Sequence, residues 1–220
     1  MPAAIFDMDG VLVDSYRPHW ESWRITCAAR GLPITEAVYA GLFGRSFRSF
    51  VEALCPRPLT EAEIQAWYDE KEELYRDIIE RDFPAMDGAS DLLAALRQAG
   101  FALAIGSSGP RGNVDCLLRH LPGADAFATT ASGDDCRNAK PDPEVFLLAA
   151  RRLGVPPRAC VVIEDSLHGL EAARRAGMAA IALTGTCTVA ELTPHADLVV
   201  TSLRDLTPPR IAALIASRKD

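Results

Sequence analysis

Residues 3–15 read AAIFDMDGVLVDS, and the change of character within this stretch decides the fold. The apolar run from Ala3 to Phe6 favours a short buried strand, which the acidic segment after it cannot continue. Gly10 then allows the chain to turn sharply away. We therefore predict a first strand that ends at Asp7, with Asp7 and Asp9 close to its carboxyl end.

After residue 84 the chain alternates short apolar runs with helical patterns. Short apolar strands that alternate with helices are typical of a parallel sheet covered on both faces. The predicted fold class is therefore α/β, with a doubly wound parallel sheet. We predict strands over 101–106, near 126–129, and over 160–163, 179–183 and 197–200, with helices over 89–99, 111–119, 143–153 and 167–176.

The segment from residue 15 to residue 83 has only helical signals. Helices are expected over 16–30, 35–42, 46–54 and 60–81, and Thr60 with Glu63 forms a capping box at the start of the last one. We predict that residues 1–14 and 84–220 form an α/β catalytic core and that residues 15–83 form an inserted all-helical cap. Because the insert follows the Asp7 loop, we expect it to act as a lid.

The composition argues against several classes of function. The chain has 220 residues and a formal net charge of -7, so no general basic surface is available for nucleic acid or an anionic membrane. No apolar run approaches the roughly 18 residues of a membrane span, and the first residues lack the basic start of a secretory signal. The six cysteines are scattered without a CxxC pair, which argues against zinc and disulfides. We expect a cytoplasmic monomer.

Polar residues follow three of the predicted strands. Asp7 closes the first, Ser107 and Ser108 follow the second, and Glu164 with Asp165 follow the fourth. The carboxyl ends of parallel strands meet at one edge of a sheet, and ligands bind there, near the point where the strand order reverses. We therefore expect these side chains around one crevice.

Asp7 and Asp9 have the chemistry of phosphoryl transfer to a carboxylate. An ionised carboxylate can attack phosphorus if a cation offsets the repulsion between the anions, and a second carboxyl group can supply and later remove a proton. The alternative is a strand that ends in a solvated acidic turn. The Asp-Met-Asp segment alone favours neither interpretation.

Glu164 and Asp165 have the oxygen ligands that Mg²⁺ prefers. The alternative is that Asp165 or Ser166 caps the helix that follows, where acidic groups are also favourable. Both interpretations can hold at once. Capping is the better one for this segment alone, whereas the presence of Asp7 and Asp9 favours Mg²⁺ binding.

Lys140 and the serine pair offer positive charge and hydrogen-bond donors to an anion. Lys140 lies in the segment AKPDP over 139–143, where prolines limit the freedom of the loop, and its ammonium can bridge a phosphate and the nucleophile. A solvent-exposed loop lysine is the alternative. Ser107 and Ser108 precede a predicted helix, where they either cradle phosphate or form a simple turn or cap.

Two residues of the insert, Lys71 and His19, are further candidates. Lys71 falls within the apolar stripe of the helix over 60–81. Its ammonium either extends outward to solvent, which the pattern slightly favours, or faces the crevice under the lid. His19 lies near the start of the first insert helix and is either a substrate contact or a satisfied interface histidine.

Together these segments resemble the haloacid dehalogenase superfamily, and within it the β-phosphoglucomutase-like phosphatases with a helical cap. Four motifs in order carry the resemblance over essentially the whole chain: DMDGVLVDS over 7–15, Ser107-Ser108, KPDP over 140–143 and VVIEDSLHGLEAA over 161–173. The resemblance implies that Asp7 is the nucleophile and Asp9 the general acid and base. The implied Mg²⁺ ligands are Asp7, the carbonyl of Asp9, Asp165 and Glu164, and the implied phosphate site is Ser107, the Ser108 amide and Lys140.

In the insert, His19 and Lys71 resemble a cap histidine and a cap lysine of the family's mutases, and Gly44-Arg45-Ser46 resembles the substrate-reading loop. The mutases carry an arginine one residue after that serine, whereas this chain has Phe47, which cannot pair with phosphate. The resemblance therefore implies Mg²⁺-dependent hydrolysis of a small phosphorylated metabolite, such as a sugar phosphate, through an aspartyl phosphate. A β-phosphoglucomutase-type mutase is the alternative. A non-catalytic metabolite-binding module is disfavoured, because no motif acid is missing.

Overall fold

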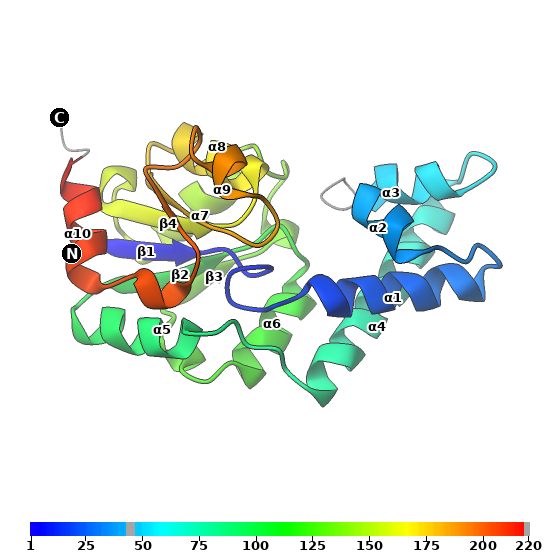
Figure 1. Cartoon of the computed structure of the whole chain (residues 1–220), viewed down its shortest axis with the longest axis horizontal. Coiled ribbons are helices and arrows are strands. Elements are labelled where there is room, and N and C mark those ends of the chain that lie inside the picture. Colours follow the sequence, from blue (N-terminus) through cyan, green and yellow to red (C-terminus); the bar gives the residue numbers. More distant parts are fainter. Residues whose placement is uncertain (43–46, 218–220) are drawn as a thin grey trace. The chain divides into compact units, whose positions relative to one another are not determined.

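The computed structural model describes residues 1–42 and 47–217. The chain divides into two compact units, one made of Met1–Asp14 with Pro84–Asp220 and the other of Ser15–Phe83 (Figure 1). We call the first the α/β unit and the second the helical unit. None of the helices in the described ranges combines the length and the apolar character that a membrane span requires.

A six-stranded sheet forms the centre of the α/β unit (Figure 1). Its strand order is β3-β2-β1-β4-β5-β6, and every neighbouring pair is parallel. The strand order reverses on either side of β1, which lies between β2 and β4. The strands are β1 (Ala3–Phe6), β2 (Ala102–Gly106), β3 (Thr129–Ala131), β4 (Cys160–Glu164), β5 (Ala179–Leu183) and β6 (Leu198–Val200). The doubly wound parallel α/β fold predicted from the sequence is confirmed.

Helices cover both faces of this sheet. Helices α7 and α8 pack on one face, while α5 and α6 lie on the opposite one (Figure 1). Strands β1, β4 and β5 are buried along their whole length, as expected for strands with two covered faces. The helices of this unit are α5 (Ala89–Gln98), α6 (Arg111–His120), α7 (Glu144–Leu153), α8 (Leu167–Arg175), α9 (Val189–Leu192) and α10 (Pro208–Ser217), with 3-10 turns η1 (Ala124–Ala126), η2 (Gly133–Asp135), η3 (Pro157–Ala159) and η4 (Leu203–Asp205).

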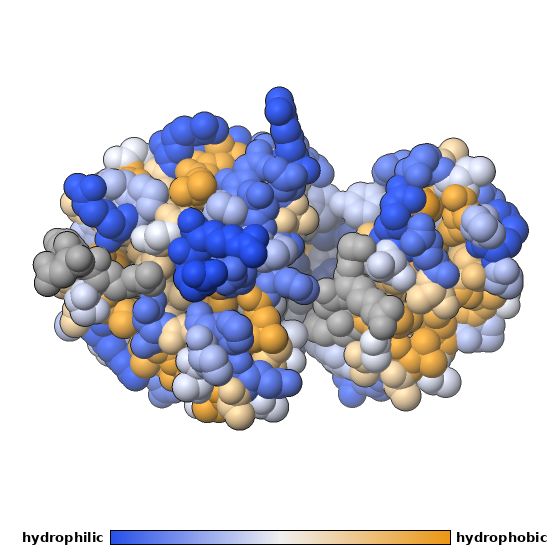
Figure 2. All heavy atoms as spheres, turned by 90° about the horizontal axis from the view of Figure 1, so that it is seen from above, coloured by the Kyte–Doolittle hydropathy of each residue, from blue (hydrophilic) through white to orange (hydrophobic). Residues whose placement is uncertain are grey.

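The exterior of the α/β unit contrasts with its apolar interior. On the face drawn in Figure 2, hydrophilic and hydrophobic residues are interspersed over the surface of this unit. Large aliphatic residues of the central strands are enclosed instead, with Ile5, Ile105 and Ile163 fully buried. Burial of such side chains from water is the main driving force for this arrangement.

One predicted strand is displaced. The strand expected near 126–129 is β3, Thr129–Ala131, and residues 124–126 form the 3-10 turn η1. The reason lies in tertiary packing. The β3 residues pair with Ala104, Ile105 and Gly106, whereas Phe127 turns its ring edge-on to Phe6, with a centroid distance of 5.9 Å. A local apolar pattern does not distinguish these two uses of an apolar residue.

The chain leaves and re-enters the α/β unit through two segments that lie side by side. Val13 pairs with Ala85 in an antiparallel bridge. The Asp14 N–H donates to the Pro84 carbonyl at 2.9 Å, and the Met86 N–H donates to the Leu12 carbonyl at 2.9 Å. The segment between them therefore begins and ends at adjoining points.

The helical unit contains α1 (Tyr16–Ala29), α2 (Glu36–Leu42), α3 (Phe47–Leu54) and α4 (Glu61–Arg81). The predicted capping box is present, with the Thr60 hydroxyl accepting from the Glu63 N–H and the Glu63 carboxylate accepting from the Thr60 N–H. Aromatic side chains form the core, in which Trp23 stacks on Phe50 with ring centroids 3.9 Å apart. Such pairs stabilise a small unit beyond the area that they bury.

Candidate active site

Four side chains of the candidate site extend from the ends of the central strands. Asp7 follows β1, and its N–H donates to the Ile163 carbonyl at 2.9 Å. Ser107 follows β2, while Glu164 closes β4 and Asp165 follows it. Because β2, β1 and β4 are adjacent and parallel, these side chains lie at the same edge of the sheet, where the strand order reverses.

Lys140 contacts two buried carboxylates. Its Nζ lies 2.5 Å from Asp7 Oδ1 and 2.7 Å from Glu164 Oε1. Only 7% of the Lys140 side chain is exposed, and its ammonium also lies 4.5 Å from the centre of the Phe146 ring, which favours a cation. An exposed loop lysine, the alternative from the sequence, is therefore wrong.

Three carboxylates converge within reach of a single ion. Asp7, Glu164 and Asp165 are all buried, and each offers an oxygen within 4.8 Å of the others. Burial is the largest cause that raises the pKa of Asp7, to about 7, with further repulsion from Glu164 and Asp9, although Lys140 opposes the shift. Burial and the neighbouring acids also raise the pKa of Asp165 well above its usual value.

The same charges act on Lys140 in the opposite sense. Burial alone would lower the pKa of Lys140, but the carboxylates of Asp7 and Glu164 outweigh it and raise the pKa. One ammonium thus faces three carboxylates, and the site has an excess of negative charge. A divalent cation among hard oxygen donors would offset that excess and favour the ionised acids, so the donor set fits a Mg²⁺-type ion.

Glu164 is held by the start of α8. Its Oε2 accepts from the Asp165 N–H at 2.8 Å, the Ser166 N–H at 2.7 Å and the Ser166 hydroxyl at 2.9 Å. A side chain on Gly169 would collide with the Glu164 carboxylate, so the glycine makes room for it. Ser166 also caps α8, since its Oγ accepts from the Gly169 N–H at 3.1 Å. Helix capping and an acidic cluster therefore occur together.

Thr186 is a residue of the site that the sequence analysis does not single out. Its hydroxyl donates to Asp165 Oδ2 and fixes the orientation of that carboxylate. Thr186 follows β5, whose carboxyl end lies at the same edge of the sheet as β4. The strand-end argument that selects Asp7 and Glu164 would have selected this loop as well.

Ser107 and Gly109 lie beside Asp9. The buried Ser107 Oγ accepts from the Gly109 N–H at 3.0 Å. A methyl group on Gly109 would stand 3.2 Å from Ser107 Oγ and 3.8 Å from Asp9 Oδ2, so its absence leaves space between the two polar groups. Ser108 is exposed and precedes Pro110, after which α6 begins.

Two of the candidates in the helical unit, Lys71 and His19, contact each other. Lys71 is buried, with Nζ 2.9 Å from Glu72 Oε1 and 2.8 Å from His19 Nδ1. The His19 ring stacks on Tyr75, with centroids 4.0 Å apart. The outward-extending lysine that the helix pattern slightly favours is wrong, because Glu72 and His19 give the ammonium polar partners inside this unit. Gly44, Arg45 and Ser46 lie outside the described residues.

Phe47 belongs to the aromatic core of the helical unit. Its ring stacks on Trp23 at a centroid distance of 5.1 Å and meets Tyr68 edge-on at 5.0 Å. The next residue, Arg48, is exposed and forms an ion pair with Glu61 at 2.5 Å. Position 47 therefore contributes packing in this unit.

Comparison with known proteins identifies the family of this chain. Residues 1–177 match the haloacid dehalogenase-like hydrolase family. The chain is 33% identical over 182 residues to the phosphorylated carbohydrates phosphatase of Thermotoga maritima, an alignment that covers 81% of this chain and 82% of that protein. It is 31% identical over 216 residues to the β-phosphoglucomutase of Bacillus subtilis, with 94% of this chain and 92% of that protein covered.

A solved structure extends the similarity to the fold of both units. The crystal structure of CbbY from Rhodobacter sphaeroides in complex with phosphate has a TM-score of 0.82 and 29% sequence identity, and the match covers 94% of this chain and 96% of that chain. The resemblance drawn from the sequence motifs is confirmed. The chain belongs to the haloacid dehalogenase-like hydrolases, as a phosphoric monoester hydrolase of the group that includes β-phosphoglucomutase and CbbY.

Proposed function

We propose that this enzyme hydrolyses a small phosphorylated metabolite, a sugar phosphate, through a phosphoryl group carried by Asp7. The observation that carries the proposal is the contact of Lys140 Nζ with Asp7 Oδ1 at 2.5 Å inside the buried acidic cluster. The contact neutralises part of the negative charge that a phosphate would otherwise meet. The substrate class is supported by the phosphatase from Thermotoga maritima, which is named for phosphorylated carbohydrates.

In the first half-reaction, a carboxylate oxygen of Asp7 attacks phosphorus, and the bond from phosphorus to the leaving oxygen breaks. Asp9 donates a proton to that oxygen, so an alcohol leaves. In the second half-reaction, water attacks phosphorus, Asp9 takes a proton from it, and the bond to Asp7 breaks. Inorganic phosphate leaves, and both aspartates return to their starting states.

Three further groups of the α/β unit bind the phosphoryl group in this proposal. Lys140 balances its charge, and Ser107 with the Ser108 N–H donates hydrogen bonds to its oxygens. Gly109 keeps the space beside Asp9 and Ser107 open. We infer that Mg²⁺ is held by Asp7, Asp165, Glu164 and the Asp9 carbonyl, and when bound it would neutralise phosphate charge and favour the ionised form of Asp7.

We further propose that residues 1–14 with 84–220 are the catalytic core and that residues 15–83 are a cap that selects the substrate. His19, Lys71, Gly44, Arg45 and Ser46 are the proposed substrate contacts of the cap. The Lys71–His19 contact at 2.8 Å, with Lys71 buried, supplies a cationic group inside the helical unit. The six free thiols support a reducing compartment, as in cytoplasm.

The packing of Phe47 favours hydrolysis over the mutase alternative. A mutase of this kind must grip a second phosphate, and the Phe47 ring packs against Trp23 and Tyr68 instead. A coupled assay that follows glucose 1-phosphate to glucose 6-phosphate, with a bisphosphate primer, distinguishes the two. Interconversion at a rate comparable to phosphate release would overturn the assignment as a phosphatase.

The decisive experiment is a phosphate-release screen over phosphorylated sugars, polyols and short acids, with Mg²⁺ or with EDTA. Asp7→Asn should abolish release while the protein stays folded. Asp125→Asn is the matched control, because it alters an exposed acid of the α/β unit that pairs with Arg97. Acid quenching during turnover should trap a hydroxylamine-sensitive phosphoprotein. Full activity of Asp7→Asn would contradict the proposal.

A further inference from the structure

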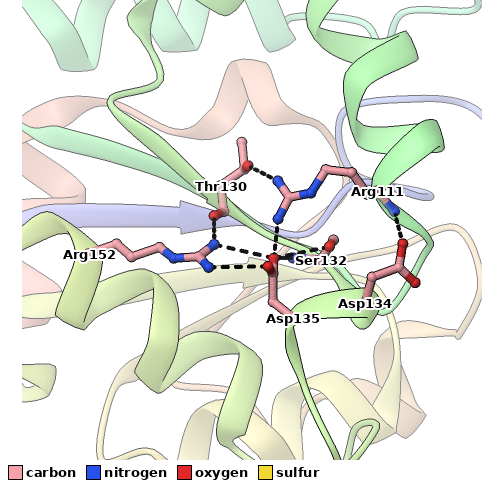
Figure 3. Close-up of polar contacts among 6 residues, drawn as sticks. All are labelled: Arg111, Thr130, Ser132, Asp134, Asp135 and Arg152. Carbon is pink, nitrogen blue, oxygen red and sulfur yellow. Dashed lines mark hydrogen bonds and ion pairs between the residues drawn. The ribbon is translucent and has the colours of Figure 1, made fainter.

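Outside the acidic cluster, the α/β unit contains a second concentration of paired charges around η2. The carboxylate of Asp135 accepts hydrogen bonds from Arg111 at the start of α6 and from Arg152 on α7 (Figure 3). Two guanidinium nitrogens of Arg152 donate to the two carboxylate oxygens of Asp135, each at 3.2 Å. The N–H and hydroxyl of Ser132 donate to Oδ2 at 2.9 and 3.0 Å. The Asp135 side chain, which is 19% exposed, thus joins α6, α7 and the start of η2.

The same turn fastens the loop that carries Ser107 and Ser108. The Ser107 N–H donates to the Ala131 carbonyl at 3.0 Å, and the Gly133 N–H donates to the Gly109 carbonyl at 2.8 Å. A side chain on Gly133 would collide with the Ser108 carbonyl, so the turn and the loop are in close contact. Both the start and the middle of the loop therefore depend on residues 131–133.

The end of the loop is fastened as well. The Arg111 N–H donates to Asp134 Oδ2 at 2.8 Å, and one guanidinium nitrogen donates to Thr130 Oγ1 at 3.0 Å while the other contacts Asp135 (Figure 3). Arg111 is close in sequence to the serines, yet its side chain is engaged by β3 and η2. Its charge therefore acts on the position of the loop.

We propose that Asp135 is a positioning residue, which holds Arg111 and Arg152 so that the loop 107–111 presents Ser107 and the Ser108 N–H to a phosphate at a fixed distance from Asp7. The inference rests on the proposed function, because it needs phosphate at this loop. Misplacement of binding groups by a fraction of an ångström to about 1 Å costs up to about a hundredfold in rate. The loss should fall on phosphate binding, because the ligands in the acidic cluster come from β1 and β4.

The test uses the full chain with p-nitrophenyl phosphate as substrate and inorganic phosphate as inhibitor. In Asp135→Asn, the inhibition constant for phosphate and the KM should rise by about tenfold or more, while the Mg²⁺ concentration for half-maximal rate stays at the wild-type value. Some loss of stability is expected in either case, since Asp135 makes ion pairs with Arg111 and Arg152. A purely structural role would lower only the stability and the active fraction, and would leave KM and the inhibition constant unchanged.

Asp87→Asn is the matched control. Asp87 also accepts a two-pronged contact from an arginine, Arg204, at 2.8 and 2.6 Å, but this pair joins the start of α5 to η4. Its loss should leave phosphate inhibition unchanged. If Asp87→Asn weakens inhibition as much as Asp135→Asn does, the effect is a general loss of stability and the proposal is wrong.

Arg111→Met is the second variant, in case Asp135→Asn does not fold. It keeps the contacts of Asp135 with Arg152 and Ser132 and releases only the loop. Arg111→Met by itself should weaken inhibition by phosphate. The inhibition constant of the double variant, which combines Arg111→Met with Asp135→Asn, should be no higher than that of the more affected single variant. Wild-type inhibition in both single variants overturns the positioning role while leaving the proposed function intact. A wild-type protein without Mg²⁺-dependent turnover would overturn both.

Discussion

Lys140 Nζ lies 2.5 Å from Asp7 Oδ1, although the two residues are 133 positions apart in the chain. The contact exists because β1 and β4 are neighbours and the loop before α7 reaches over their carboxyl ends. Glu164 fixes the same ammonium from the other side at 2.7 Å. Asp7 is thus oriented by a cation that has little freedom to move.

From this relationship we predict that turnover requires the charge of Lys140. Lys140→Met should lower kcat by about 100–1000-fold, the range seen when a preorganised donor to developing charge is removed. Lys140→Arg keeps the charge but replaces a point cation by a planar fork that two closely spaced carboxylates cannot accommodate equally. It should recover only part of the rate. Steady-state phosphate release measures both, and near-wild-type turnover of the Met variant would contradict the role assigned to the lysine.

A pair of glycine variants tests how Glu164 is held. Gly169 and Gly41 both lie in helices, so alanine favours the helix at each by up to about 1 kcal/mol. Gly41 has no neighbour within 4 Å of an added methyl group, whereas Gly169 faces the Glu164 carboxylate. Gly41→Ala should therefore stabilise the helical unit. Gly169→Ala should destabilise the α/β unit by about 1–3 kcal/mol, since Glu164 loses hydrogen bonds to backbone and Lys140.

Calorimetric melting of both variants separates these outcomes. Gly169→Ala should also require more Mg²⁺ for activity, because Glu164 moves away from Asp7 and Asp165. Equal stabilisation by the two substitutions would mean that Glu164 adapts without loss.

The environment of Asp135 predicts how stability depends on pH. The Arg152 hydrogen bond, then Ser132 and the charge of Arg111, hold the pKa of Asp135 well below its usual value, against the effect of burial. A depressed pKa in the folded state means that the unfolded chain binds the proton more readily, so stability falls as pH falls. The contribution is complete above the unfolded pKa of about 3.9, and it is lost progressively as the pH falls from there through the lower pKa of the folded state.

The free energy of unfolding of Asp135→Asn should accordingly lie below that of the wild type by a constant amount between about pH 5 and pH 8. Below about pH 4 the two curves should converge. Urea unfolding at a series of pH values measures this difference. A gap that widens on acidification would show that the ion pairs with Arg111 and Arg152 do not control the titration of this residue.

We expect the six thiols to differ in reactivity, with the buried thiols the least reactive. Cys27, Cys116 and Cys160 are buried, while Cys55, Cys136 and Cys187 are half-buried. Burial raises the pKa of Cys27 to about 12 and that of Cys160 to about 11, so almost no thiolate forms there near neutral pH. An aromatic disulfide reagent at pH 8 should label the half-buried group slowly and the buried group only after denaturation. Rapid labelling of all the thiols in the native protein would mean that both cores open readily.

The sequence allowed the sheet and the strand ends to be predicted because both depend on local patterns. Short apolar runs such as Cys160 to Ile163, which alternate with helices, are typical of strands buried on both sides. The polar residue after each run predicts the edge of the sheet where a ligand would bind. The burial of Lys140 does not follow from its local sequence, since a loop lysine is usually exposed. Its burial depends on Asp7 and Glu164, which are distant in sequence and become neighbours only when the sheet forms.

The features that could not be predicted are long-range pairs of side chains. The helical pattern around Lys71 favours an ammonium that extends to solvent. The pattern does not reveal that His19, on another helix, lies 2.8 Å from the Lys71 ammonium. Likewise, nothing local to Arg111 indicates that its guanidinium binds Asp135. The shift of β3 has the same origin, since the position of an edge strand follows its partner.

The antiparallel bridge between Val13 and Ala85 closes the base of the inserted segment as a hairpin would. The chain therefore leaves the α/β unit and returns to it at the same place, where backbone N–H groups of Asp14 and Met86 donate to backbone carbonyls of the same unit. A longer or shorter set of helices could replace residues 15–83 between these two points without changing the pairing of β1 with its neighbours. If residues 15–83 select the substrate, as proposed above, changes confined to this segment would alter the substrate while the carboxylates around Lys140 are kept.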